Sequence, residues 1–194
     1  MFKRLFDFCV SASGLLLLSP VFLAVAVLVK VGDGGPVFFL HERIGRGFAP
    51  FKMYKFRTMV TDAARLGPAV TKGGDPRITR VGAFLRKTKL DELPQLINVA
   101  KGDMSLVGPR PEVARYVEAF RDEYAEILSV RPGITDYASI MYRDEEEVLR
   151  GAADLEKTYV GEVLPRKLML NREYIRKASA LEDIRIIFRT IASL

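Results

Sequence analysis

The sequence contains a single cysteine, a single histidine and no tryptophan. Cys9 has no second cysteine with which to form an internal disulfide, and Cys9 with His41 cannot supply the ligands of a usual structural zinc site. The sequence also lacks a P-loop, the glycine spacing of a dinucleotide-binding turn, internal repeats and low-complexity tracts. The low cysteine content fits a reducing environment that faces the cytoplasm.

The 194 residues are enough for one domain with a hydrophobic core and too few for two comfortable ones. Hydrophobic residues make up 49% and charged residues 28% of the chain, which argues against disorder. The net charge of +6 is unevenly spread, because residues 1–110 hold 17 basic and 8 acidic residues whereas residues 111–194 hold 13 and 16. Such a basic half can attract anionic lipid head groups, nucleic acid or phosphate-bearing small substrates, or can simply solubilise the surface.

An apolar segment of 22 residues without a charge runs from Phe8 to Val29. That length can cross a bilayer as a straight helix, so a simple transmembrane span is the default interpretation. A cleaved signal peptide is disfavoured, because the apolar run is too long and no small-residue cleavage site closes it. Ser19 and Pro20 interrupt the middle of the run. Because Pro20 has no N–H, the Leu16 carbonyl loses its helical partner, and the Ser19 hydroxyl is well placed to replace it.

Basic residues flank this apolar segment at both ends. Lys3 and Arg4 precede it, and six further basic residues follow within residues 30–57. By the positive-inside rule, both ends favour the cytoplasmic side. A helix broken at Ser19 and Pro20 has two arms of about 11 residues, each roughly 17 Å long, which reach about halfway into the hydrocarbon core. The sequence therefore favours a re-entrant helical hairpin over a full span.

The hairpin is expected to occupy residues 1–31, and a cytosolic, membrane-associated domain is expected to occupy residues 32–194. Local signals in that domain predict a turn at Asp33-Gly34-Gly35-Pro36 and short strands at 37–40 and 51–59. Loops are expected over 43–47, which carries two basic residues and two glycines, and over the glycine-rich residues 67–75.

Helical periodicity is strongest in the second half of the chain. Apolar residues from 113 to 127 and from 181 to 191 recur at spacings of three or four, which predicts two amphipathic helices. Each helix can face the core, and the C-terminal one can instead lie in a membrane interface. The prediction is a mixed α/β fold that is predominantly helical, with the hairpin at one end and interfacial amphipathic helices along the membrane.

Residues 77–111 hold the densest group of charges, with seven basic residues around the pair Asp91-Glu92. Asp91 at an N-cap would place Pro94 in the first turn of a helix, and Gly102 would end that helix. A helix N-terminus among arginines favours phosphate, and two carboxylates there can hold Mg²⁺ or provide a nucleophile beside a metal ligand. The alternative is that Asp91 and Glu92 merely cap the helix.

Five motifs together carry a resemblance to a known family. They are Lys3-Arg4-Leu5-Phe6-Asp7, Ser19-Pro20, Tyr54-Lys55-Phe56-Arg57-Thr58-Met59, Leu90-Asp91-Glu92-Leu93-Pro94-Gln95-Leu96 and the run from Asn98 to Pro111. Read together, these motifs resemble the bacterial sugar transferase family, the monotopic phosphoglycosyl transferases. The resemblance runs from about Lys3 to the C-terminus. It is most specific over residues 84–111. The length implies the catalytic core alone, without the multi-span N-terminal region of longer relatives.

The resemblance implies a mechanism and a location. Asp91 would attack the β-phosphate of a UDP-sugar, release UMP and form a covalent sugar-phosphate enzyme, from which a polyprenol phosphate accepts the group. Glu92 would be a Mg²⁺ ligand or a helper, with Asp91 as a second possible ligand. Such an enzyme would act at the cytoplasmic face of the bacterial inner membrane, in the first membrane step of polysaccharide or glycan biosynthesis. It would have no nucleic-acid partner.

Further positions are carried over from the family residue by residue. Pro132-Gly133-Ile134-Thr135 matches a family motif, and Arg143 then takes a phosphate-binding role together with Arg110 and Arg86. Asp136 and Ser139 stand where the family usually has Gly and Gln, which leaves the sugar and nucleotide contacts of this loop open. Supporting roles are expected for Asp183, Lys55 and Arg57.

Two other kinds of protein remain compatible with the residues. One is a non-catalytic, membrane-anchored module that binds anionic lipid or RNA through its basic half and does not require Asp91. The other is a peripheral glycosyltransferase that moves the sugar without its phosphate. The by-product separates the three possibilities, because the favoured reaction releases UMP, the glycosyltransferase releases UDP and the binding module releases neither.

Overall fold

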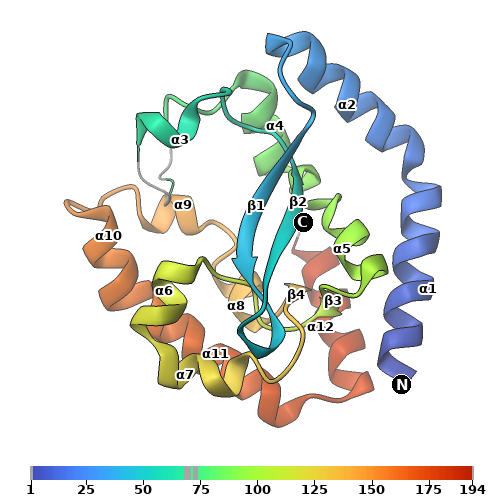
Figure 1. The fold of residues 1–194 in the computed structure, drawn as a ribbon, viewed down its shortest axis with the longest axis vertical. Coiled ribbons are helices and arrows are strands. Elements are labelled where there is room, and N and C mark those ends of the chain that lie inside the picture. The colour runs from blue at the N-terminus through green and yellow to red at the C-terminus, as the bar shows by residue number, and fades with distance from the viewer. Residues whose placement is uncertain (1, 68–70, 72–73, 194) are drawn as a thin grey trace.

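The computed structural model describes residues 2–67, 71 and 74–193. Most of the described chain is helical, and the two small sheets lie among the helices (Figure 1). A mixed α/β fold with more helix than strand was predicted, and this is confirmed. The elements follow in the order α1 Phe2–Leu17, α2 Ser19–Asp33, β1 Phe38–Ile44, η1 Arg46–Phe48, β2 Pro50–Phe56, α3 Ala63–Leu66, α4 Arg80–Lys87, η2 Leu90–Glu92, α5 Gln95–Lys101, β3 Ser105–Val107, α6 Ala114–Ala119, α7 Arg121–Ile127, β4 Gly133–Thr135, α8 Tyr137–Met141, α9 Glu145–Val148, α10 Leu155–Thr158, η3 Tyr159–Val163, α11 Leu164–Lys177 and α12 Ala180–Ala192.

The apolar N-terminal segment forms two helices, α1 and α2, that meet at a bend of 61° and run along one side of the molecule (Figure 1). Within the described ranges, no single helix is long and apolar enough to cross a membrane, whereas the bent pair meets that requirement together. The break lies at the predicted place. The Ser19 hydroxyl donates to the Leu16 carbonyl at 2.8 Å, as expected where Pro20 cannot supply an N–H.

Helix α1 turns its polar side chains toward the rest of the protein. Arg4 donates to the carbonyls of Val99 and Ala100 at 2.5 and 2.7 Å, at the C-terminal end of α5. Asp7 is 2% exposed and accepts a hydrogen bond from the Leu106 N–H at 3.2 Å. A cation at a helix C-terminus is favourable, because the last carbonyls lack helical partners. Charge-assisted hydrogen bonds therefore fix α1 to the domain.

Helix α2 is held mainly by apolar packing. Val25 and Val29 are buried against Phe56 of β2 and Leu85 of α4. At the end of α2, Asp33 accepts two hydrogen bonds from the Arg57 guanidinium, from Nη1 to Oδ2 and from Nη2 to Oδ1. These contacts tie the second helix of the bent pair to the strand and helix that flank the acidic pair at 91–92.

The two sheets each contain two strands. Strands β1 and β2 pair antiparallel from Phe38 opposite Phe56 to Ile44 opposite Pro50, and β3 and β4 pair parallel. The predicted strands at 37–40 and 51–59 correspond to β1 and β2. The loop predicted over 43–47 is partly wrong, because the backbone of Arg43 and Ile44 continues the ladder with β2. Residues 68–70 and 72–73 of the loop predicted over 67–75 lie outside the described residues.

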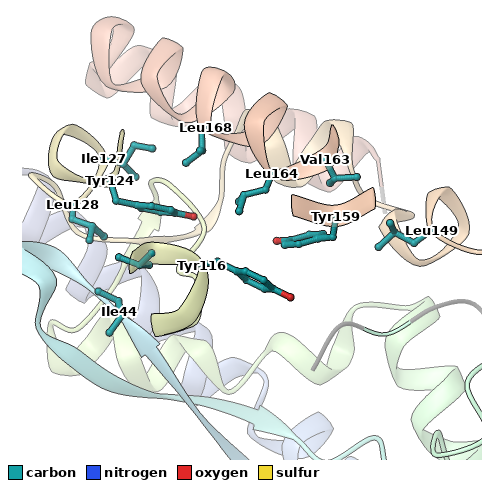
Figure 2. Close-up of a cluster of buried hydrophobic side chains, with 11 residues drawn as sticks. Ile44, Tyr116, Tyr124, Ile127, Leu128, Leu149, Tyr159, Val163, Leu164 and Leu168 are labelled. Atoms are coloured by element: carbon teal, nitrogen blue, oxygen red, sulfur yellow. The ribbon is translucent and has the colours of Figure 1, made fainter. Parts of the chain in front are cut away.

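Both predicted amphipathic stretches are helical. The stretch 113–127 contains α6 and α7, which are separated at Phe120, where φ is −126° and ψ is 42°. Apolar residues of both helices join a buried cluster beneath α11, shown in Figure 2. The stretch 181–191 lies within α12, which buries Ile186 but leaves large apolar side chains exposed at Leu181, Ile184, Phe188 and Ile191.

Candidate active site

The acidic pair lies in a tight turn between α4 and α5. Lys89 adopts a left-handed conformation with φ 56°, which redirects the chain into the short 3₁₀ turn Leu90–Glu92. Asp91 therefore lies inside a helical turn, and the expectation that it is an N-cap is wrong. Pro94 occupies the N-cap position of α5, where its missing N–H costs no helical bond. Gly102 ends α5 in a left-handed conformation with φ 99°, as predicted.

Glu92 is held by two cations. Arg110 donates Nη1 to Glu92 Oε2 at 3.0 Å and Nη2 to Oε1, and Lys55 Nζ donates to Oε1 at 2.9 Å. The two-pronged contact with a guanidinium is a strong arrangement for a carboxylate. Burial opposes ionisation of Glu92, but the charges of Arg110 and Lys55 outweigh it and hold the pKa of Glu92 well below its ordinary value.

Asp91 differs from its neighbour because its carboxylate makes no hydrogen bond or ion pair with another described residue. The residue is 6% exposed, and burial raises its pKa, with a further increase from the charge of Glu92. The charges of Lys55, Arg86 and Arg110 act in the opposite direction. Asp91 is thus a buried carboxylate with free oxygens in a cationic environment, which is a suitable environment for a nucleophile that must approach a phosphate.

Two other predicted phosphate-binding arginines belong to segments that meet this turn. Arg86, in the last turn of α4, donates from Nε to the Thr58 hydroxyl at 2.9 Å. Its positive charge lowers the pKa of Asp91. Arg143 follows α8, and its backbone carbonyl accepts a hydrogen bond from Lys89 Nζ at 2.8 Å. The residue that redirects the chain into the acidic turn therefore also fixes the Arg143 segment.

Two predicted supporting residues have their described contacts elsewhere. Arg57 is engaged by Asp33 and donates Nε to the Pro36 carbonyl at 2.6 Å. Asp183 is 7% exposed and accepts from Lys3 Nζ at 2.5 Å and from the Tyr174 hydroxyl at 2.8 Å. No hydrogen bond or ion pair among the described residues links Arg57 or Asp183 to the acidic turn. Their visible role is to hold α2 and α1, respectively.

The oxygens of Asp91 and Glu92 indicate how the expected Mg²⁺ could be held. Both oxygens of Glu92 already accept hydrogen bonds from cations, so Asp91 is the carboxylate of the pair with free oxygens. The described ranges contain no group of three or more acidic, histidine or cysteine side chains that could enclose a metal ion. Mg²⁺ commonly binds one or two carboxylates together with substrate phosphates and water. The residues fit an ion carried by a diphosphate and held by Asp91, rather than an ion enclosed by the protein alone.

Two buried polar residues at this site have structural roles that the sequence did not predict. Asp136 is fully buried, caps α8 through the Ser139 N–H at 2.7 Å and accepts from the Arg110 N–H at 3.3 Å. Gln95 is 1% exposed, and neither atom of its amide has a hydrogen-bond partner among the described residues. The position of Gln95 directly after Asp91-Glu92-Leu93-Pro94 was the signal that could have identified it, since helical residues three or four apart are neighbours.

The comparisons with known proteins identify the family of the chain. A family model described as bacterial sugar transferase matches residues 1–194. The chain is 40% identical to the UDP-N-acetylgalactosamine-undecaprenyl-phosphate N-acetylgalactosaminephosphotransferase of Aeromonas hydrophila, over 99% of this chain and 43% of that protein. It is 39% identical to the UDP-glucose:undecaprenyl-phosphate glucose-1-phosphate transferase of Escherichia coli K12, over 98% of this chain and 39% of that protein.

A third relative is matched over most of its own length. The chain is 40% identical to the exopolysaccharide production protein PSS of Rhizobium leguminosarum bv. phaseoli, over 98% of this chain and 94% of that protein. The chain thus spans about two fifths of the first two relatives and nearly all of the third. Because the family model matches residues 1–194, the chain belongs to the bacterial sugar transferase family.

Proposed function

We propose that this chain is a phosphoglycosyl transferase that moves a sugar 1-phosphate from a UDP-sugar to a polyprenol phosphate. The observation that carries the proposal is the state of Asp91, which is buried, has no partner among the described residues and lies in the field of three cations. The relatives support the reaction class, because two of them are named as undecaprenyl-phosphate sugar phosphotransferases. An account in which the pair only caps a helix leaves a buried, unpaired carboxylate unexplained.

The first step of the proposed reaction is attack by a carboxylate oxygen of Asp91 on the β-phosphorus of the UDP-sugar. A phosphorus–oxygen bond forms to Asp91, the bond to the bridging oxygen breaks, and UMP leaves with that oxygen. In the second step an oxygen of the polyprenol phosphate attacks the same phosphorus. The acyl phosphate bond breaks, Asp91 returns to a carboxylate, and the lipid carries the sugar through a diphosphate.

The other residues of the site would act by position and charge. Arg110 and Lys55 are held by Glu92, so their charges stay beside Asp91 without closing on it. Together with Arg110, Arg86 and Arg143 would bind the phosphates of the donor, since planar guanidinium groups match phosphate oxygens. Mg²⁺, when bound, would neutralise part of the diphosphate charge, and Asp91 with the substrate phosphates would hold it.

The bent pair α1–α2 supports a membrane location for this chemistry. We propose that it enters the bilayer as a re-entrant hairpin from the cytoplasmic face of the bacterial inner membrane, so that residues 3 and 33 lie on the same side. The hairpin exposes many large apolar side chains, among them Leu16 and Leu17 beside the break, at 76% and 77%. Cysteine-accessibility labelling in a Cys9-free background tests this topology, and labelling of residues 3 and 33 from opposite sides would contradict it.

The purified protein should be assayed with a panel of UDP-sugars, a polyprenol phosphate and Mg²⁺. Release of UMP together with a lipid-linked sugar diphosphate is the expected result. Release of UDP would indicate transfer of the sugar alone. Binding of lipid vesicles without release of any nucleotide would indicate a non-catalytic module.

A further inference from the structure

A glutamate lies two residues after Arg110, and another lies two residues after Arg143. Glu112 follows Arg110 and is 9% exposed, and Glu145 follows Arg143 at the start of α9. The acidic turn contacts both segments, through Glu92 to the Arg110 side chain and through Lys89 to the Arg143 carbonyl. The separation of the two arginines therefore depends on what joins these segments.

A chain of polar contacts links the two glutamates. The Tyr159 hydroxyl donates to Glu112 Oε2 at 2.6 Å. Lys167 Nζ donates to the Tyr159 hydroxyl at 3.3 Å and to Glu145 Oε2 at 2.7 Å. Arg43 Nη1 donates to Glu112 Oε1 at 2.5 Å, so both oxygens of this buried carboxylate have partners.

The linking residues are rigidly supported. Tyr159 and Lys167 are 3% and 8% exposed, and Tyr159 begins the π-helical turn η3 that leads into α11. Figure 2 shows Tyr159 in the buried cluster with Leu164 and Tyr124, below the α11 ribbon. A π-helical turn is rare and is frequent at functional sites. Burial of a lysine between a carboxylate and a hydroxyl restricts its position, because each polar group there needs its partner.

We propose that the chain of contacts Glu112–Tyr159–Lys167–Glu145 is a positioning device that sets the separation between Arg110 and Arg143 and thereby the grip of the site on a nucleoside diphosphate. This inference rests on the proposed function and adds two positioning residues to it, Tyr159 and Lys167, which do not touch the substrate. They act through the backbone of the two arginine segments. The negative charge of Glu145 also raises the pKa of Arg110, after the larger effect of Glu92, which places Glu145 near that arginine.

The test measures binding of UDP, in the presence of Mg²⁺, to the detergent-solubilised full chain by titration calorimetry, together with kcat and KM for the active UDP-sugar. Lys167→Met should weaken UDP binding and raise KM about tenfold, because it frees the Glu145 segment. Tyr159→Phe removes one hydroxyl and should weaken binding about threefold. Lys167→Arg keeps a cationic donor and should recover part of the loss.

Tyr124→Phe is a matched control, since Tyr124 is buried in the same cluster and its hydroxyl makes no hydrogen bond to another described residue. This variant should bind UDP within twofold of wild type. In an Arg143→Ala background, Lys167→Met should cause no further loss beyond twofold, because its effect passes through the Arg143 segment.

The outcomes separate this inference from the proposed function. A lower melting temperature for Lys167→Met with UDP affinity and KM unchanged would assign the linkage to stability alone and overturn the inference. An undiminished Lys167→Met effect in the Arg143→Ala background would also overturn it. If the wild type binds UDP but releases no UMP from any UDP-sugar, the proposed function fails while the linkage is still tested by UDP binding. If the wild type does not bind UDP, both fail.

Discussion

Several carboxylates are buried in this protein, and two of the places where they lie pair them differently. In the chain of contacts Glu112–Tyr159–Lys167–Glu145, both oxygens of the buried Glu112 carboxylate accept hydrogen bonds, one from Arg43 and one from Tyr159. In the acidic turn, Glu92 is paired in the same way with Arg110 and Lys55, but Asp91 beside it is not paired with any described residue. Burial disfavours the ionised carboxylate at both places, so the difference in pairing points to different purposes.

A paired buried carboxylate is part of the folded structure, because removing it leaves an uncompensated cation. An unpaired one costs stability and is retained where it has another use. The comparison therefore assigns Glu112 to the structure that supports and positions the site, Asp91 to the chemistry and Glu92 to both. Variants at these residues should separate the effects on turnover from the effects on stability.

The largest expected effect is on turnover at Asp91. Asp91→Asn keeps the size of the side chain but removes the nucleophilic charge, so sugar-phosphate transfer should fall by at least about 10³-fold. The melting temperature in detergent should not fall, because the substitution removes a buried, unpaired charge. A melting temperature lower by more than about 4 °C, roughly 1 kcal/mol for a chain of this size, would place Asp91 among the structural residues.

The opposite pattern is expected at Glu112. Glu112→Gln removes the charge that compensates Arg43 in a buried site, and the loss of one partner of a buried ion pair typically costs about 3–5 kcal/mol. We expect the melting temperature to fall by more than about 6 °C, as measured by the loss of helical circular dichroism on heating. A fall of less than about 2 °C would show that Arg43 does not depend on this carboxylate.

A third effect concerns pH. Asp91 must be ionised to attack, and burial raises its pKa, so activity should be lost on acidification at a higher pH than an ordinary aspartate would give. The charge of Glu92 raises the pKa of Asp91 further. In Glu92→Gln, the acidic limb of the kcat/KM profile should therefore move to lower pH, beside a reduced maximum. Movement of that limb to higher pH would show that Asp91 is not the titrating group.

The smallest effect is expected at Gln95, whose buried amide has no partner among the described residues. An apolar side chain of similar shape avoids the desolvation cost of such a group, so Gln95→Met should raise stability by about 1 kcal/mol, or about 2–4 °C in melting temperature. An unchanged or lower melting temperature would mean that the amide is satisfied in solution. Asn98→Met is the matched control, because the Asn98 amide pairs with β2 and its loss should destabilise the protein.

The features that the sequence predicted well depend on local signals. The helix break follows from the missing N–H of Pro20, and the end of α5 follows from the conformational freedom of Gly102. Roles for Lys55 and Arg110 were implied by the family resemblance, but their contacts with Glu92, 37 and 18 positions away, were not predicted.

Long-range pairing explains what the sequence did not predict. Arg57 and Lys55 lie in the same motif, yet Arg57 pairs with Asp33 whereas Lys55 pairs with Glu92. Adjacent strand positions face opposite ways, but residues two apart share a face, so only the positions of the surrounding helices decide which acid each cation meets. Asp91 was mistaken for an N-cap because the left-handed conformation of Lys89, a rare one for a lysine, leaves no signal in the sequence.

The central claim is that the unpaired carboxylate of Asp91 becomes covalently bound to the sugar phosphate. Intact-protein mass spectrometry after mixing the enzyme with its UDP-sugar and Mg²⁺, without a lipid acceptor, tests it most directly. The account predicts a mass gain of one sugar phosphate, at most one UMP released per enzyme, and neither in Asp91→Asn. An adduct that persists in Asp91→Asn, or UMP that appears only when the lipid acceptor is also present, would contradict covalent catalysis by Asp91.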